Sequence, residues 1–201
     1  DKSTFYPGRL DAKMQEMIEQ MFWLYVSKMS LFERASLDHI WSIHGSENHE
    51  MMHYSNALLA LQALKNSPTY QKRILPDGRS LQSHYEAWNT YYKEYCLSRA
   101  KHGLLVEVFS AYGPSYTLPE IMNMRDLSED EVLRERMDKL LHLIWADWAV
   151  GQLNGVRGGG RTRIYKEDPE NIRQLTQWGS GDRWRTMSRV LLHESEWWSP
   201  R

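Results

Sequence analysis

Two histidines four residues apart lie in a stretch whose residue types could do chemistry. Residues 49–53 read His-Glu-Met-Met-His and fit the H-E-x-x-H pattern of zinc peptidases. On a helix, positions i and i+4 share a face, so His49 and His53 could bind one Zn²⁺ while Glu50 activates water. Catalytic zinc needs a third protein ligand, and residues 54–59 do not continue the motif. The metal site therefore remains an alternative, and we expect no cofactor.

A second group of reactive residues lies in a glycine-rich stretch. Residues 155–162 nearly match the phosphate-binding pattern G-x-x-x-x-G-K-T, with Arg in the place of Lys. Phosphate loops follow a strand and precede a helix, whereas a long predicted helix precedes this stretch, so we exclude nucleotide binding. The stretch still brings together Arg157, Arg161 and Arg163. Guanidinium groups bind planar oxyanions in bidentate fashion, so these arginines form either a carboxylate or sulfate clamp or a solvated basic loop.

The elements that must position these residues are helices. Apolar residues at spacings of three and four, without convincing strand alternation, predict an all-α chain. The predicted helices cover residues 10–29, a segment that includes residues 49–53 and ends at Lys65, and residues 83–103, 128–151, 169–177 and 182–194. We expect capping boxes at Ser83 with Glu86 and at Ser128 with Glu131. Without a linker or a legible repeat, residues 1–201 are predicted to form one domain of helical hairpins.

The composition excludes several classes of protein. The 201 residues contain 25 Lys and Arg against 26 Asp and Glu, which argues against a nucleic-acid groove or an anionic-membrane surface. No apolar run is long enough for a membrane span, and the single cysteine, Cys96, rules out an internal disulfide. Nine Trp and eleven Tyr provide either bulk for helix packing or a cleft on which sugars stack.

Four ordered segments resemble a family of bacterial proteins with helical-toroid domains. Residues 46–49 resemble its S-E-N-H signature at a helix start, and residues 103–110 look like its G-F-x-E-W-x-S segment. Residues 123–131 are similar to its N-x-x-D-F-A-x-D-E, and residues 160–165 resemble its closing G-R-x-Y. The family usually has Gln after S-E-N-H, so the resemblance makes Glu50, and with it the zinc motif, incidental.

The resemblance implies an (α/α) toroid, the scaffold of many polysaccharide lyases and some glycoside hydrolases. Three hairpins make about half of a six-hairpin ring, so the chain is expected to form a toroid or roughly half of one. Helical-toroid lyases of this kind work with Asn, His, Tyr and Arg. The matching positions are Asn48, His49, Tyr116 (or Tyr112) and Arg161 (or Arg157).

These residue types suit β-elimination from a uronic-acid polymer. Asn48 and an arginine would neutralise the substrate carboxylate and stabilise the developing enolate-like charge. His49 would remove the C5 proton, because an imidazole is a base near neutral pH, and Tyr116 would protonate the leaving O4. The expected substrate-binding residues are Glu47, Glu107, Tyr112, Arg157 and Arg163.

Several of these residues also have a structural alternative. Asn48 and Glu47 could cap a helix, and Glu107, in an apolar stretch, could pair with an arginine.

Three other functions remain open. An inverting glycoside hydrolase would use two carboxylates from Glu47, Glu107 and Asp147. A helical scaffold could bind glycans or proteins through its aromatic residues without turnover, and a zinc peptidase would use His49 and His53. Degraders of polysaccharide usually act outside the cytoplasm, and the chain starts at Asp1 rather than Met. We therefore expect a periplasmic or secreted protein whose partner is an anionic polysaccharide or oligosaccharide; the sequence does not indicate an oligomeric state.

Overall fold

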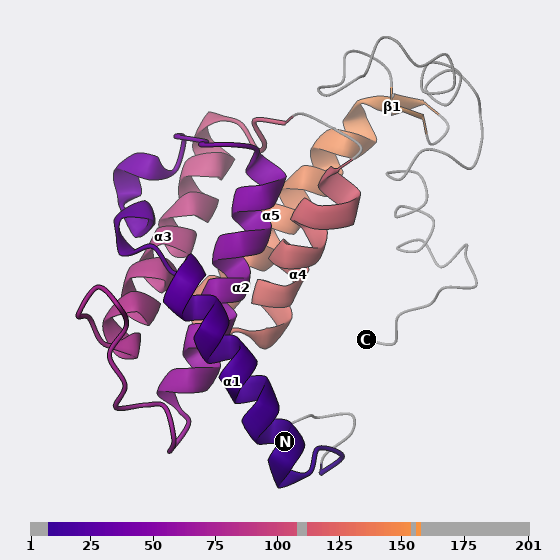
Figure 1. The fold of residues 1–201 in the computed structure, drawn as a ribbon. Coiled ribbons are helices and arrows are strands. Elements are labelled where there is room, and N and C mark those ends of the chain that lie inside the picture. The colour runs from indigo at the N-terminus through magenta and orange to yellow at the C-terminus, as the bar shows by residue number, and fades with distance from the viewer. Residues whose placement is uncertain (1–7, 108–111, 154–155, 158–201) are drawn as a thin grey trace, which may run out of the picture.

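The described residues of the chain form helices in a computed structural model (Figure 1), which describes residues 8–107, 112–153 and 156–157. The α-helices are α1 (Ala12–Met29), α2 (Glu47–Lys65), α3 (Leu81–His102), α4 (Leu118–Leu127) and α5 (Glu131–Val150). Shorter elements are the 3₁₀ turns η1 (Phe32–Ala35) and η2 (Leu37–His39), the π-helical turn η3 (Gly113–Thr117), and a small antiparallel hairpin of β1 (Gln152–Leu153) and β2 (Val156–Arg157). The predicted all-α class is confirmed.

Two helical hairpins, α2/α3 and α4/α5, pack side by side, and α1 packs on α2. Gln62 of α2 donates to the Leu127 carbonyl at 2.9 Å, so the C-terminal ends of α2 and α4 lie together. The Cys96 Sγ of α3 lies 3.5 Å from the Met137 Sδ of α5. Nearer the start of the helices, Ser55 of α2 donates to Glu120 of α4, and Asn89 of α3 donates to Asp130, which precedes α5. Helices α2 and α4 therefore run parallel, as do α3 and α5, whereas neighbours in an up-and-down bundle are antiparallel.

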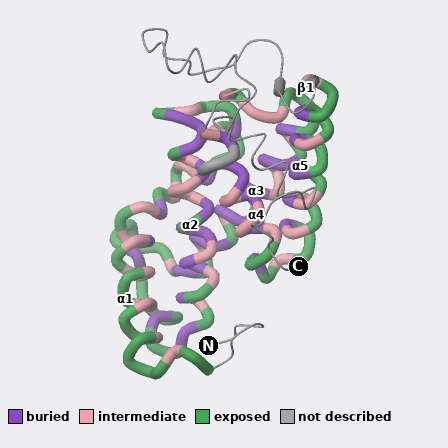
Figure 2. Tube along the Cα trace, turned by 90° about the vertical axis from the view of Figure 1, so that its right-hand side faces the viewer, coloured by how far each residue is buried: buried purple, intermediate pink, exposed green. Residues whose placement is uncertain are grey.

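The core lies between these two parallel pairs (Figure 2). The spacing of apolar residues within 128–151 predicts a buried stripe, and α5 buries it as expected. Its members are each at most 7% exposed: Leu133, Met137, Leu140, Leu141, Ile144 and Trp148. Several aromatic residues provide packing bulk here, since the rings of Tyr54 and Trp88 stack with centroids 4.5 Å apart and Tyr92 is 1% exposed. Burial of such large side chains supplies much of the hydrophobic stabilisation.

Both predicted capping boxes are wrong, because a different residue caps each helix. Ser80 accepts a hydrogen bond from the Ser83 N–H at 3.1 Å and starts α3. Asp130 accepts one from the Leu133 N–H at 2.9 Å and starts α5. The Ser128 hydroxyl instead accepts from the Asp130 N–H at 3.2 Å. A residue caps a helix only when it directly precedes the first turn, which Ser83 and Ser128 do not.

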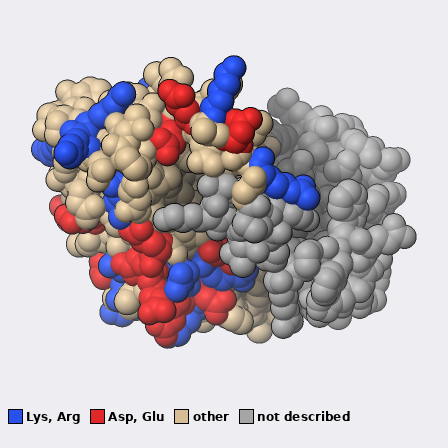
Figure 3. Space-filling view, turned by 90° about the horizontal axis from the view of Figure 1, so that it is seen from below, with Lys and Arg blue, Asp and Glu red and all other residues tan. Residues whose placement is uncertain are grey.

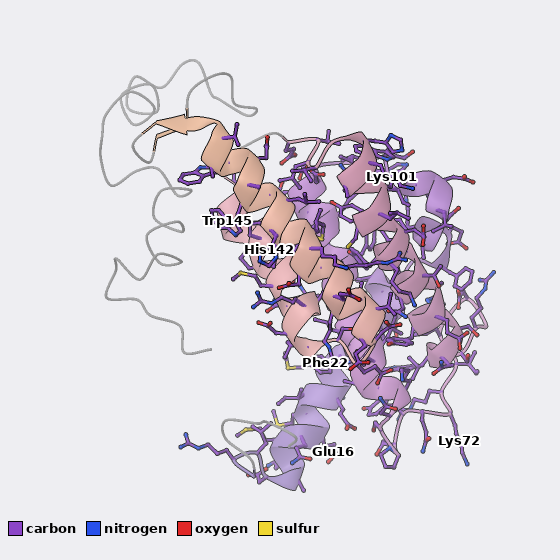
Figure 4. All side chains as sticks on the ribbon, turned by 180° about the vertical axis from the view of Figure 1, so that it is seen from behind. Glu16, Phe22, Lys72, Lys101, His142 and Trp145 are labelled. Carbon is purple, nitrogen blue, oxygen red and sulfur yellow. The ribbon has the colours of Figure 1, made fainter. Side chains whose placement is uncertain are left out.

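Helix α1 confirms the predicted helix over residues 10–29, but much of its apolar stripe does not face the core. Met17, Met21 and Leu24 of that stripe are more than half exposed. The packed side carries Phe22 and Val26, and the Tyr25 hydroxyl donates to the His53 carbonyl of α2 at 3.0 Å. Figure 4 shows Phe22 where α1 meets the other helices.

Two predicted helices, 169–177 and 182–194, lie outside the described residues. Within the described part of the chain, no helix is long and apolar enough to cross a membrane. The face drawn in Figure 3 carries both Lys and Arg and Asp and Glu side chains on its described part, in keeping with the nearly balanced composition.

Asp130 ties the two hairpins together and gives a pH-dependent prediction. Burial alone would raise its pKa, but hydrogen bonds from Asn89, Lys93 and the Leu133 N–H lower the pKa to about 2. The carboxylate therefore stabilises the fold above its ordinary pKa of 3.8, and this contribution is lost as the pH falls toward 2. Asp130→Ala is expected to cost about 1–2 kcal/mol near neutral pH.

Urea unfolding followed by circular dichroism measures this effect. The difference between wild type and Asp130→Ala should shrink as the pH falls from about 4 to 2. Glu131→Ala is the control, because the Glu131 side chain is 90% exposed and its loss should change the unfolding free energy by less than about 0.5 kcal/mol. A difference that is constant with pH would contradict the assignment.

Candidate functional site

The first turn of α2 carries the S-E-N-H residues and presents them in different directions. Ser46 has an extended backbone and precedes the helix, and its Oγ lies 2.5 Å from the His49 Nδ1. Glu47 and Asn48 are buried, at 4% and 2% exposed, whereas His49 is exposed. Successive residues of a helix are rotated by about 100°, so the buried face that holds Glu47 and Asn48 ends before His49. His49 is thus the one of these three that can reach a ligand from solvent.

Glu47 forms a buried ion pair with Arg99 of α3. Its Oε1 lies 2.9 Å from the Arg99 Nη1, and the Arg99 side chain is 1% exposed. The guanidinium also donates to the Ile40 carbonyl at 3.0 Å and lies over the rings of Trp41 and Tyr95, 4.0 and 4.7 Å from their centroids. Such cation–π contacts stabilise a guanidinium that is removed from water.

Glu47 also holds the segment that leaves α3. Its two carboxylate oxygens accept hydrogen bonds from the backbone N–H groups of Val106, at 3.1 Å, and Glu107, at 2.8 Å. Burial raises the pKa of Glu47, while Arg99 and these two N–H groups act in the opposite direction. Both oxygens are therefore occupied, and the geometry gives Glu47 a structural role; it does not support the predicted role in substrate binding.

Glu107 is less buried than its apolar sequence surroundings suggest. Its place in an apolar run suggests deep burial and, as an alternative to substrate binding, a pairing with an arginine of the glycine-rich stretch. In the structure the chain leaves the helix at Gly103, whose φ of 117° ends α3, and Glu107 is only half-buried. The argument from a buried charge therefore does not apply to it, and its side chain lies at an accessible position.

The two candidate tyrosines lie together, next to α2. Tyr116 belongs to η3, which packs against both α2 and α4, and its N–H donates to the Tyr112 carbonyl at 2.9 Å. The rings of Tyr112 and Tyr116 stack with centroids 5.7 Å apart and an interplanar angle of 27°. Tyr116 is 36% exposed, so its phenol can meet a ligand. The segment fixed by Glu47 therefore leads toward a tyrosine pair that borders the helix carrying His49.

The structure describes only a small part of the arginine cluster. The backbone of Arg157 lies in β2 and pairs with Gln152, while Arg161 and Arg163 lie outside the described residues. Figure 1 shows the hairpin of β1 and β2 at the end of the molecule where α2 begins and α3 ends. The backbone of Arg157 thus lies at the same end as the S-E-N-H turn.

The histidine pair lacks the arrangement of a zinc peptidase in the described part of the chain. His49 and His53 stack with ring centroids 6.3 Å apart. The Glu50 carboxylate accepts a hydrogen bond from the His44 N–H at 2.6 Å, so it links α2 to the preceding loop. No group of three His, Cys, Asp or Glu side chains among the described residues is placed to hold a metal ion.

Arg99 is the site residue that the sequence analysis missed, although a signal was present. Trp88, Tyr92 and Tyr95 follow one another at spacings of four and three on the buried side of α3, and Arg99 continues that stripe. A charged residue in a core stripe indicates a buried partner, because an unpaired buried charge is costly. Searching for that partner would have pointed to an acid such as Glu47.

Comparisons with known proteins do not assign the chain to a family. No family model, no curated protein and no solved structure matches it. The site therefore has to be interpreted from its own residues and geometry.

The Glu47–Arg99 pair gives a prediction about stability and local order. Arg99→Met leaves a carboxylate buried without its guanidinium and should cost about 3–5 kcal/mol. The double variant Arg99→Met with Glu47→Leu should cost less than the sum of the two single changes. Chemical denaturation of the four proteins measures this coupling, and amide exchange at Val106 and Glu107 reports whether the segment loosens.

Arg79→Met is the matched control for this prediction. Arg79 pairs with Asp77 at 3.0 Å, but its side chain is 43% exposed, so its loss should cost at most about 1 kcal/mol. An Arg99→Met variant as stable as this control, with unchanged exchange at residues 106–107, would show that the buried pair does not organise the site.

Proposed function

We propose that the chain is a carbohydrate-active domain that cleaves uronic-acid-containing polysaccharides by β-elimination. One observation carries the proposal: helix α2, whose first turn presents His49, packs against the η3 segment that presents Tyr116, and both side chains are exposed. A base and an acid on neighbouring elements are what a proton abstraction followed by protonation of a leaving oxygen requires.

We further propose that the helical hairpins form an (α/α) toroid or roughly half of one. In such a ring each hairpin contributes one helix to an inner layer and one to an outer layer. Helices of one layer then run parallel, as α2 with α4 and α3 with α5 do. This arrangement supports the proposal, and it suits the resemblance noted in the sequence.

The proposed roles follow from accessibility. The Ser46 hydroxyl fixes the His49 ring through Nδ1, which leaves Nε2 for the C5 proton of the substrate. The Tyr116 phenol protonates the leaving O4, and the stacked Tyr112 ring offers an apolar face to a sugar. Asn48, at 2% exposed, is too deeply buried to touch the polymer directly.

Neutralising the substrate carboxylate then falls to the arginine-rich stretch. We assign this role to Arg157, Arg161 and Arg163, whose guanidinium groups suit bidentate contact with a carboxylate. Glu107, at the accessible end of the segment that Glu47 fixes, is a candidate for contacts with sugar hydroxyl groups. The proposed partner is an anionic polysaccharide or oligosaccharide, met in the periplasm or outside the cell.

A panel of uronic-acid polymers tests the reaction. Elimination creates an unsaturated uronate, so wild type should raise the near-ultraviolet absorbance with at least one polymer. His49→Ala and Tyr116→Phe should each lower kcat by about 10²–10⁴-fold, because each removes one proton-transfer group. Tyr112→Phe should retain most activity if Tyr116 is the acid.

His53→Ala is the matched control, since it removes the neighbouring imidazole and should leave the elimination rate close to that of wild type. New reducing ends without absorbance would instead indicate a hydrolase. Turnover of a peptide that stops with a chelator would indicate a zinc peptidase that uses His49 and His53.

The stacked tyrosine pair also favours a second candidate, a scaffold that binds glycans without turnover. Stacking of a sugar on aromatic rings needs neither His49 nor an acid. Saturable binding of a polymer without product, weakened by Tyr112→Ala but unchanged in His49→Ala, would replace the lyase proposal with this one.

A further inference from the structure

One side of α1 carries an apolar seam that faces away from the core. The seam residues are Met14, Met17, Met21 and Leu24, which are 47%, 56%, 66% and 63% exposed. Their spacings of three, four and three are those of the a and d positions that join two helices in a coiled coil. Figure 2 shows exposed residues along α1, and Figure 4 shows Glu16 on the part of α1 that lies away from the hairpins. Four neighbouring long apolar side chains on one stripe indicate a docking surface rather than scattered surface residues.

An apolar groove adjoins this seam. It has a volume of about 530 Å³ and lies between α1, α2 and α4. Its apolar lining includes Met21 and Phe22 of α1, Leu59 of α2 and Leu127 of α4, while Asn56 and Gln62 are among its polar residues. The volume exceeds that of an indole ring, so the groove can accept a large side chain of a helix lying on the seam.

The C-terminal part of the chain has a segment with matching spacing. Residues 182–198 lie outside the described residues, and their sequence places Trp184, Met187, Leu191 and Trp198 at spacings of three, four and seven. We propose that residues 182–198 dock as a helix along the α1 seam, with one of these tryptophans in the adjoining groove.

Charge at the edge of the seam favours the same pairing and gives it a direction. Lys13 is exposed one residue before Met14, at the N-terminal end of the seam. At helical spacing, Arg183 borders the apolar stripe of the C-terminal segment near its start, and Glu194 falls on the stripe itself, between Leu191 and Trp198. Charged side chains that border a helix seam pair across it and help to set partner and orientation. An antiparallel segment brings Glu194 to Lys13, whereas a parallel segment would bring Arg183 there.

The connection is long enough for this docking. The 24 residues between Arg157 and Asp182 can span up to about 80 Å when extended. Helix α5 has 20 residues and is about 30 Å long. The chain can therefore return from the end of α5 past the length of the molecule to α1.

A segment of the same chain suits the seam better than a second copy does. The seam covers about three helical turns, roughly 15 Å, which is short for the ~800 Å² per partner of a stable interface. A tethered helix has an effective concentration in the millimolar range, so a small surface suffices. Methionine side chains adapt well to such a partner.

Photocrosslinking of the full chain tests the proposal without any substrate, so its outcome is separate from that of the elimination assay. A benzophenone placed on Met17→Cys should form an intrachain product within residues 182–198, found by peptide mass spectrometry. The native Cys96 is 4% exposed and burial raises its pKa to about 12, so it should not take the label. The control is Leu143→Cys, since Leu143 is 42% exposed on α5.

Substitutions give a second measurement. Trypsin should cut at Arg185 and Arg189 at least tenfold faster in Met17→Glu with Met21→Glu than in wild type, because the charges would release the segment. Leu97→Glu with Leu143→Glu makes the same chemical change at apolar side chains that are 39% and 42% exposed on α3 and α5, and should leave the rate unchanged.

Three results would overturn the proposal. One is a crosslink at position 17 no more specific for residues 182–198 than the crosslink at position 143. Another is equal cleavage in both double variants and wild type. The third is an interchain crosslink with a mass in light scattering that doubles with concentration, which would assign the seam to a second copy.

Discussion

The buried pair of Glu47 and Arg99 is the interaction on which the arrangement of the candidate site depends. It joins the start of α2 to the end of α3, and it fixes the backbone at residues 106–107. A carboxylate removed from water has to be satisfied at both oxygens, and here two backbone N–H groups donate to it while the Arg99 guanidinium balances its charge. The backbone that leaves α3 at residues 106–107 is therefore held by one buried charge.

This constraint separates the structural members of the S-E-N-H turn from the accessible one. Glu47 and Asn48 face inward and are committed to the fold, while His49 faces outward with its ring oriented by Ser46. Asn48 and His49 are adjacent in sequence but differ in exposure, because successive residues of a helix are rotated by about 100°. A signature of four residues can for this reason encode a scaffold and a reactive group together.

The sequence predicted where the main helices lie, but it did not predict which side of each helix packs against its neighbours. Regular spacing predicted α5 and its buried stripe correctly, because local pattern and burial agree there. It predicted α1 as a helix but could not show that Met17 and Met21 lie on the outer side, since that depends on which side meets α2. The pairing of Glu47 with Arg99 joins residues 52 positions apart, and no local pattern specifies such a contact.

The π-helical turn η3 runs directly into α4. A π-helical turn contains about one residue more than an α-helical turn, and such insertions are often found at functional sites. Deleting one residue there would rotate position 116 relative to α4 by about 100° around the helix axis. A single-codon change in length at this turn is therefore enough to align or misalign the phenol with its neighbours.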